Sequence, residues 1–152
     1  MKKSVIAAIT VTALSFTSFE HAQSSSERAT AQDLQQETSE LLSTLKQYTA
    51  DQRDEAIESA EQAVTKLDRR IDELENRIDN NWDEMSAAAR QEARANLRAL
   101  RQQRNELAEW FGGFKNSSAG AWEQMKQGFS DAYQALSDAW GEAAAEYESD
   151  NK

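Results

Sequence analysis

Residues that could carry acid–base or metal chemistry are scarce in this chain. The sequence holds one His, His21, and no Cys. Without imidazole or thiolate ligands, a zinc or transition-metal site would have to be built from carboxylates alone, which suit those metals poorly. Acidic residues do occur in adjacent pairs, such as Asp72-Glu73, but neighbouring residues on a helix point in different directions. We therefore predict no catalytic residues, no cofactor, no metal site and no small-molecule substrate, and expect that the protein is not an enzyme.

The clearest pattern of large side chains lies near the C-terminus, where we predict an amphipathic helix over residues 118–148 and a frayed tail over 149–152. An approximate eleven-residue repeat keeps apolar residues on one side, because three turns of α-helix take about eleven residues. This candidate interaction face consists of Trp122, Met125, Phe129, Tyr133, Leu136 and Trp140. Such a face can be core, a self-association surface or a lipid-contacting surface. Core or oligomer packing is favoured, because the polar side is acidic whereas lipid-seeking helices usually carry Lys and Arg there.

Two heptad seams precede this helix and must position it. Apolar residues alternate three and four positions apart in a first segment over about 27–79 and in a second over about 86–114. The first seam contains Ile57, Ala60, Val64, Leu67, Ile71, Leu74 and Ile78. The second contains Ala93, Leu97, Leu100, Arg104, Leu107, Phe111 and Phe114. The seams differ in phase, which predicts a turn at about 80–88.

Arg104 is the one charged residue at a position of the second seam. A polar seam residue can select register or oligomeric state. Alternatively, its aliphatic stem packs in the seam while the guanidinium reaches Glu61 or Glu106 at the surface. The second interpretation is the simpler one.

These patterns predict an all-α fold, with an antiparallel coiled-coil hairpin over residues 25–117 and the third helix folding along the first. The first segment is acidic and the second basic, which favours antiparallel pairing. In the expected register Ile71 lies opposite Leu100, and Tyr48 lies opposite Trp122. The first segment is about as long as the second and third together, and a kink or break is expected at Gly112-Gly113 and 116–120.

The N-terminal residues have the layout of a secretory signal peptide. Lys2 and Lys3 precede an uncharged, largely apolar run over 4–16, and a polar stretch rich in small residues follows. Cleavage after Ser24 or after Ala22 fits, and an uncleaved anchor is the alternative. The expected location after removal of residues 1–24 is the periplasm or the medium. A formal net charge of −10 argues against nucleic acid as a partner.

Three stretches resemble a group of small bacterial exported coiled-coil proteins, described as apolipoprotein-like or stress-response proteins. They are "KLDRRIDELENRID", "QEARANLRALRQQRNELAEW" and "SSAGAWEQMKQGFSDAYQALSDAW". The resemblance implies an exported helical hairpin with a stress-related role, and it brings no catalytic residues. We therefore expect a non-enzymatic protein that acts by protein–protein contact, as a scaffold, adaptor or holdase-like factor. Self-association is expected because a two-helix seam leaves apolar edges; a peripheral lipid-binding protein is the alternative.

Overall fold

The computed structural model describes residues 31–150, so the predicted signal peptide over 1–24 lies outside the described residues. The elements are α1 (Ala31–Gln47), the 3₁₀ turn η1 (Ala50–Gln52), α2 (Arg53–Asn80), the 3₁₀ turn η2 (Trp82–Glu84), α3 (Ala87–Lys115) and α4 (Trp122–Asp150). Residues 31–150 contain no strand, and the predicted all-α class is confirmed.

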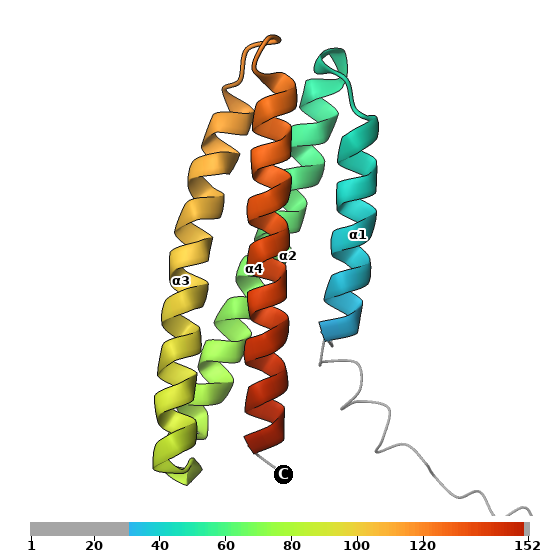
Figure 1. The fold of residues 1–152 in the computed structure, drawn as a ribbon. Coiled ribbons are helices and arrows are strands. Elements are labelled where there is room, and N and C mark those ends of the chain that lie inside the picture. Colours follow the sequence, from blue (N-terminus) through green and yellow to red (C-terminus); the bar gives the residue numbers. More distant parts are fainter. Residues whose placement is uncertain (1–30, 151–152) are drawn as a thin grey trace, which may run out of the picture.

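The four helices lie side by side in one bundle (Figure 1). Each helix runs opposite to the one before it, and the loops that follow α1 and α3 lie at the same end. α4 packs against both α3 and α1. Because α2 and α4 are separated by one helix in this order, they run in the same direction.

The first predicted segment is divided between two helices. α1 ends at Gln47 and α2 starts at Arg53. Between them Thr49 is extended, with φ −91° and ψ 171°, and its N–H donates to Gln52 Oε1 at 3.3 Å. The Gln52 N–H in turn donates to the Thr49 carbonyl at 3.0 Å. Folding back at this turn lets α1 bury Leu34 and Leu45 in the bundle, an arrangement that a weak seam alone does not reveal.

The connection between α2 and α3 is short and well capped. The helix of α2 ends at Asn80, and Ser86 caps α3 by accepting a hydrogen bond from the Ala89 N–H at 3.1 Å. Arg90 reaches back from the first turn of α3, and its Nε donates to the Trp82 carbonyl at 2.7 Å. The turn is therefore closed by a side chain from the helix that follows it.

The glycine pair does not end α3. Gly112 and Gly113 lie inside the helix, which continues to Lys115. The break falls at residues 116–121, where Asn116 Nδ2 donates to the Gly112 carbonyl at 2.8 Å. Arg53 of α2 also donates to the carbonyls of Lys115, at 3.2 Å, and Ser117. These groups cap carbonyls at the end of α3 and just beyond it.

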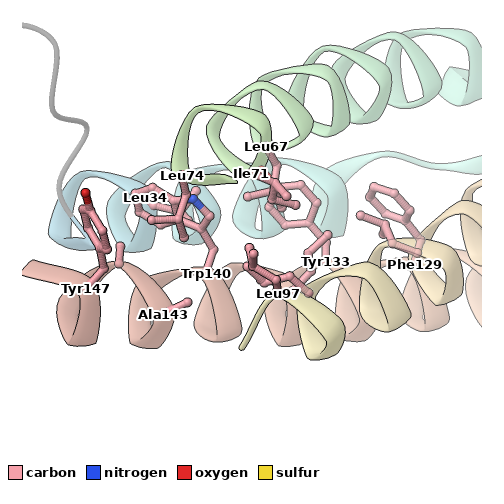
Figure 2. Packing of buried hydrophobic residues seen from close by; sticks show 14 of the residues in the cluster. Leu34, Leu67, Ile71, Leu74, Leu97, Phe129, Tyr133, Trp140, Ala143 and Tyr147 are labelled. Atoms are coloured by element: carbon pink, nitrogen blue, oxygen red, sulfur yellow. The ribbon is translucent and has the colours of Figure 1, made fainter. Parts of the chain in front are cut away.

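The core runs the length of the bundle and is lined by the apolar stripes of all four helices. Leu67, Ile71 and Leu74 of α2 are fully buried. In Figure 2 these three side chains and Leu34 of α1 face the aromatic residues of α4. The helices therefore cover one another's seams, and α1 and α4 close the edges that a two-helix hairpin would leave open.

Candidate functional site

Most of the predicted interaction face lies inside the bundle. Trp122, Phe129, Tyr133, Leu136 and Trp140 are buried, whereas Met125 is half-buried. The buried positions of α4 follow a heptad, with spacings of four and three, rather than the eleven-residue repeat. They include Trp122, Lys126, Phe129, Tyr133, Leu136, Trp140, Ala143 and Tyr147. Intramolecular packing thus occupies this face in the structure.

The polar tips of three aromatic residues on α4 bond to the backbone of α2. Figure 2 shows the three rings among the buried residues. The donors are spaced by seven residues, and so are the carbonyl acceptors. The bonds join Tyr133 Oη to Ala63 at 3.4 Å, Trp140 Nε1 to Arg70 at 3.0 Å and Tyr147 Oη to Arg77 at 3.0 Å. A helical carbonyl has a second lone pair free for such a bond. A slip of one residue between α2 and α4 would break all three bonds, so they specify the register of this parallel pair.

Tyr133 lies at the floor of a cavity of about 240 Å³ between α1 and α2. Burial raises the pKa of Tyr133 from 10.0 to about 12; the nearby Arg70 guanidinium lowers the pKa and Glu37 raises it. The phenol therefore stays protonated at neutral pH and acts as a hydrogen-bond donor. Arg70 itself pairs with Glu37 at 2.9 Å and lies 6.0 Å from the centre of the Trp140 ring, so it links α1, α2 and α4.

Lys126 is a buried cation that the sequence analysis missed. It is 7% exposed, and its Nζ donates to the Tyr48 carbonyl and to Glu123 Oε1, each at 3.0 Å. The Trp122 Nε1 donates to the same carbonyl at 3.4 Å. A cation at the C-terminal end of α1 is favoured by the helix dipole. Lys126 lies seven residues before Tyr133, so the heptad pattern of α4 could have identified it as a buried position.

Arg104 joins α3 to α2 at the surface. Its Nε lies 2.8 Å from Asp68 Oδ1, and its Nη1 lies 3.3 Å from Asp72 Oδ1. The carboxylates expected from the sequence, Glu61 and Glu106, are not its partners. Arg104 pairs instead with Asp68 and Asp72, which directly follow the seam residues Leu67 and Ile71 on α2. The side chain is 36% exposed, which limits the strength of these pairs.

A second surface feature lies where α2 turns into α3. A cavity of about 680 Å³ is lined by Asp79, Trp82, Asp83, Arg94, Leu97, Arg98 and Arg101. The Trp82 ring lies under two guanidinium groups, with its centroid 4.7 Å from Arg94 Cζ and 5.6 Å from Arg90 Cζ. The regular spacing of arginines on α3 predicts a basic face on this helix. It does not predict that Trp82 packs among these arginines.

Trp110 is the exposed large hydrophobic residue of the described chain, at 38%. It lies across the backbone of Gly128 on α4, where a Cβ atom would overlap the indole ring. Phe111, the next residue, is half-buried and contacts Phe129 with ring centroids 5.8 Å apart. The indole of Trp110 therefore packs where Gly128 has no side chain, and part of the ring remains exposed to solvent.

Within residues 31–150, no group of three or more His, Cys, Asp or Glu side chains is placed to hold a metal ion. None of the described helices is both long enough and apolar enough to cross a membrane. Comparison of the chain with protein-family models, with curated proteins and with solved structures returned no match.

Proposed function

We propose that this chain is an exported, non-enzymatic helical protein that acts through contact with another protein, in a role connected with envelope stress. The observation that carries the proposal is Trp110, the large apolar side chain that is exposed at the surface of α3, while the other large apolar side chains of the described residues are buried or half-buried. Export rests on the signal-like sequence of residues 1–24. The proposed stress role rests on the sequence resemblance.

Trp110 has the properties of an interface anchor. Tryptophan is among the residue types that contribute most to binding when a partner covers them. The ring packs against Gly128 of α4, and this contact restricts the side-chain freedom that would be lost on binding. Lys115 lies 4.8 Å from the centre of the neighbouring Phe111 ring and gives the patch a cationic edge. An apolar centre with a polar edge is typical of a protein-binding surface.

The sequence predicts self-association because a two-helix seam leaves an apolar edge open. In the bundle α1 and α4 cover that edge, so association in this proposal uses Trp110 instead. The proposal keeps α2 and α3 as an antiparallel coiled-coil pair. It is supported by the interhelical ion pairs of Arg101 with Glu75 at 3.0 Å and of Arg104 with Asp68 at 2.8 Å.

Site-specific photocrosslinking in cells tests the proposal. The full chain is produced with a photoreactive phenylalanine at position 110 and, as a matched control, at Gln102, which is exposed on the same helix. We expect a discrete protein adduct from position 110 in the periplasmic fraction and none from position 102. Equal crosslinking at both positions, or an intact N-terminus in the cytoplasmic fraction, would contradict it.

The lipid-binding alternative requires the bundle to open, because its aromatic stripe is internal. Flotation of the mature protein with neutral and with anionic vesicles tests this alternative. A Trp122→Ala plus Trp140→Ala variant is the control. Flotation of the wild-type protein with loss of its near-ultraviolet dichroism would support lipid contact over protein contact.

A further inference from the structure

Charged side chains line the contact between α2 and α3 as a ladder, that is, a series of arginines on α3 opposite carboxylates on α2. Ion pairs form along only part of this series. Arg104 pairs with Asp68 and Asp72, and one turn closer to the connecting turn Arg101 pairs with Glu75 at 3.0 Å. In an antiparallel pair, a step back along α3 matches a step forward along α2. Continuing the series would therefore bring Arg98 to Asp79 near the end of α2, and Arg94 to Asp83 in the η2 turn that follows.

The ion pairs are not formed at Arg98 and Arg94. Across the part of the chain that the structure describes, no carboxylate lies within ion-pairing distance of Arg94 or Arg98. Both arginines and both aspartates instead line the cavity of about 680 Å³. Trp82 accounts for part of the opening, because its ring holds Arg94 at 4.7 Å. Arg90 is engaged by the backbone, with its Nη2 donating to the Asp83 carbonyl at 3.1 Å.

We propose that this cavity binds a small organic anion, with a carboxylate or phosphate group carried on an apolar body. Two guanidinium groups without carboxylate partners can each offer a planar pair of N–H donors to such a group. The stacking of Arg94 on Trp82 orients one of them before binding. Leu97 and the edge of Trp82 supply the apolar wall, and the volume is in the range of small-molecule sites.

Two features restrict the charge of the ligand. Asp79 and Asp83 line the same cavity, so a polyanion such as a nucleic acid would meet repulsion on one side. The chain as a whole carries a formal charge of −10, which adds to that repulsion. One anionic group at the arginine side, with the apolar body over Leu97, avoids both effects. This site is independent of the Trp110 surface.

Equilibrium titration with a matched set of probes tests the site. The probes are naphthyl phosphate, which carries both features, naphthol, which lacks the anion, and inorganic phosphate, which lacks the apolar body. Wild-type protein is expected to bind naphthyl phosphate about tenfold or more tightly than either partial probe. Amide shifts in NMR spectra should centre on Trp82 and Leu97.

Arg94→Gln plus Arg98→Gln is the test variant, and Lys66→Gln plus Arg69→Gln, exposed on α2, removes the same charge elsewhere. We expect the affinity for naphthyl phosphate to fall about tenfold in the first and to stay within about twofold in the second. Equal affinities in the two variants, or equal binding of naphthol, would overturn the site. So would closed Arg98–Asp79 and Arg94–Asp83 pairs with no probe binding.

Vesicles of phosphatidylcholine with and without phosphatidic acid distinguish a lipid headgroup from a soluble source of the same anionic group. Flotation that needs both phosphatidic acid and the two arginines supports the site and identifies a lipid source. Binding of naphthyl phosphate without flotation supports the site and identifies a soluble ligand.

Discussion

The two sides of α2 are used in different ways. Toward α4, α2 offers backbone carbonyls to buried aromatic tips, such as that of Trp140 at 3.0 Å from the Arg70 carbonyl. Toward α3, it offers carboxylates to arginines that remain in contact with solvent, such as Arg104. The first contact has a single geometry, because the donors are rigid rings in a packed core. The second tolerates rearrangement, because long side chains can change partners in water.

This difference predicts where stability and adaptability lie. Loss of a buried hydrogen bond leaves an unsatisfied polar group and costs about 1–3 kcal/mol. An exposed ion pair contributes about 0–1 kcal/mol and weakens with salt. The α2–α4 contact should therefore hold the fold, and the α2–α3 surface is free to carry an open cavity at Arg94 and Arg98.

The largest expected effect is at Trp140, which is 2% exposed. Trp140→Ala removes the indole from the core together with its bond to the Arg70 carbonyl, and should lower the free energy of unfolding by about 3–5 kcal/mol. Urea denaturation followed by circular dichroism measures it. The matched change on the other side of α2, Arg101→Ala, should cost under about 1 kcal/mol. Similar losses of unfolding free energy in Trp140→Ala and Arg101→Ala would show that the α4 and α3 sides of α2 contribute equally to stability.

The next effect depends on pH and concerns Tyr133. Because burial raises the pKa of its folded-state phenol from 10.0 to about 12, its contribution is fully present below pH 10 and is lost as pH rises toward 12. A shift of this size corresponds to about 2–3 kcal/mol. Unfolding free energies of wild type and Tyr133→Phe, compared at several pH values, isolate this residue from the other bases. Parallel curves between pH 10 and pH 12 would mean that the phenol is solvated.

The sequence predicted the helical class because apolar residues recur three and four apart over most of the described chain. The interruption at Thr49 was missed, since a 3₁₀ turn held by Gln52 leaves only a weakened seam as its trace. At Gly112 and Gly113 the sequence suggested an interruption, because glycine lowers helix propensity, but both residues are helical. Met125 of α4 packs beside Gly113.

The candidate face was identified by residue type and core or oligomer packing was favoured for it, but its bonds to the backbone of α2 were not predicted. Periodicity marks Tyr133 and Trp140 as apolar neighbours, and it cannot say which helix covers them. The carbonyl acceptors on α2 are invisible in sequence, because every residue carries one. The cavity beside Trp82 depends on a turn that places an indole among arginines, and no spacing rule encodes that position.

The smallest expected effect concerns the pair of Arg104 and Asp68, 2.8 Å apart on the surface of α3 and α2. Arg104→Gln and Asp68→Asn should each cost about 0.5 kcal/mol, and the double variant less than their sum, because both remove the same attraction. The coupling should fade as salt is raised, since exposed charges are screened. A coupling that persists at high salt, or one as large as the loss from Trp140→Ala, would mean that Arg104 selects the register of the helices. In that case the α3 side of α2 would be as rigid as the α4 side, and an adaptable cavity beside it would lose its physical basis.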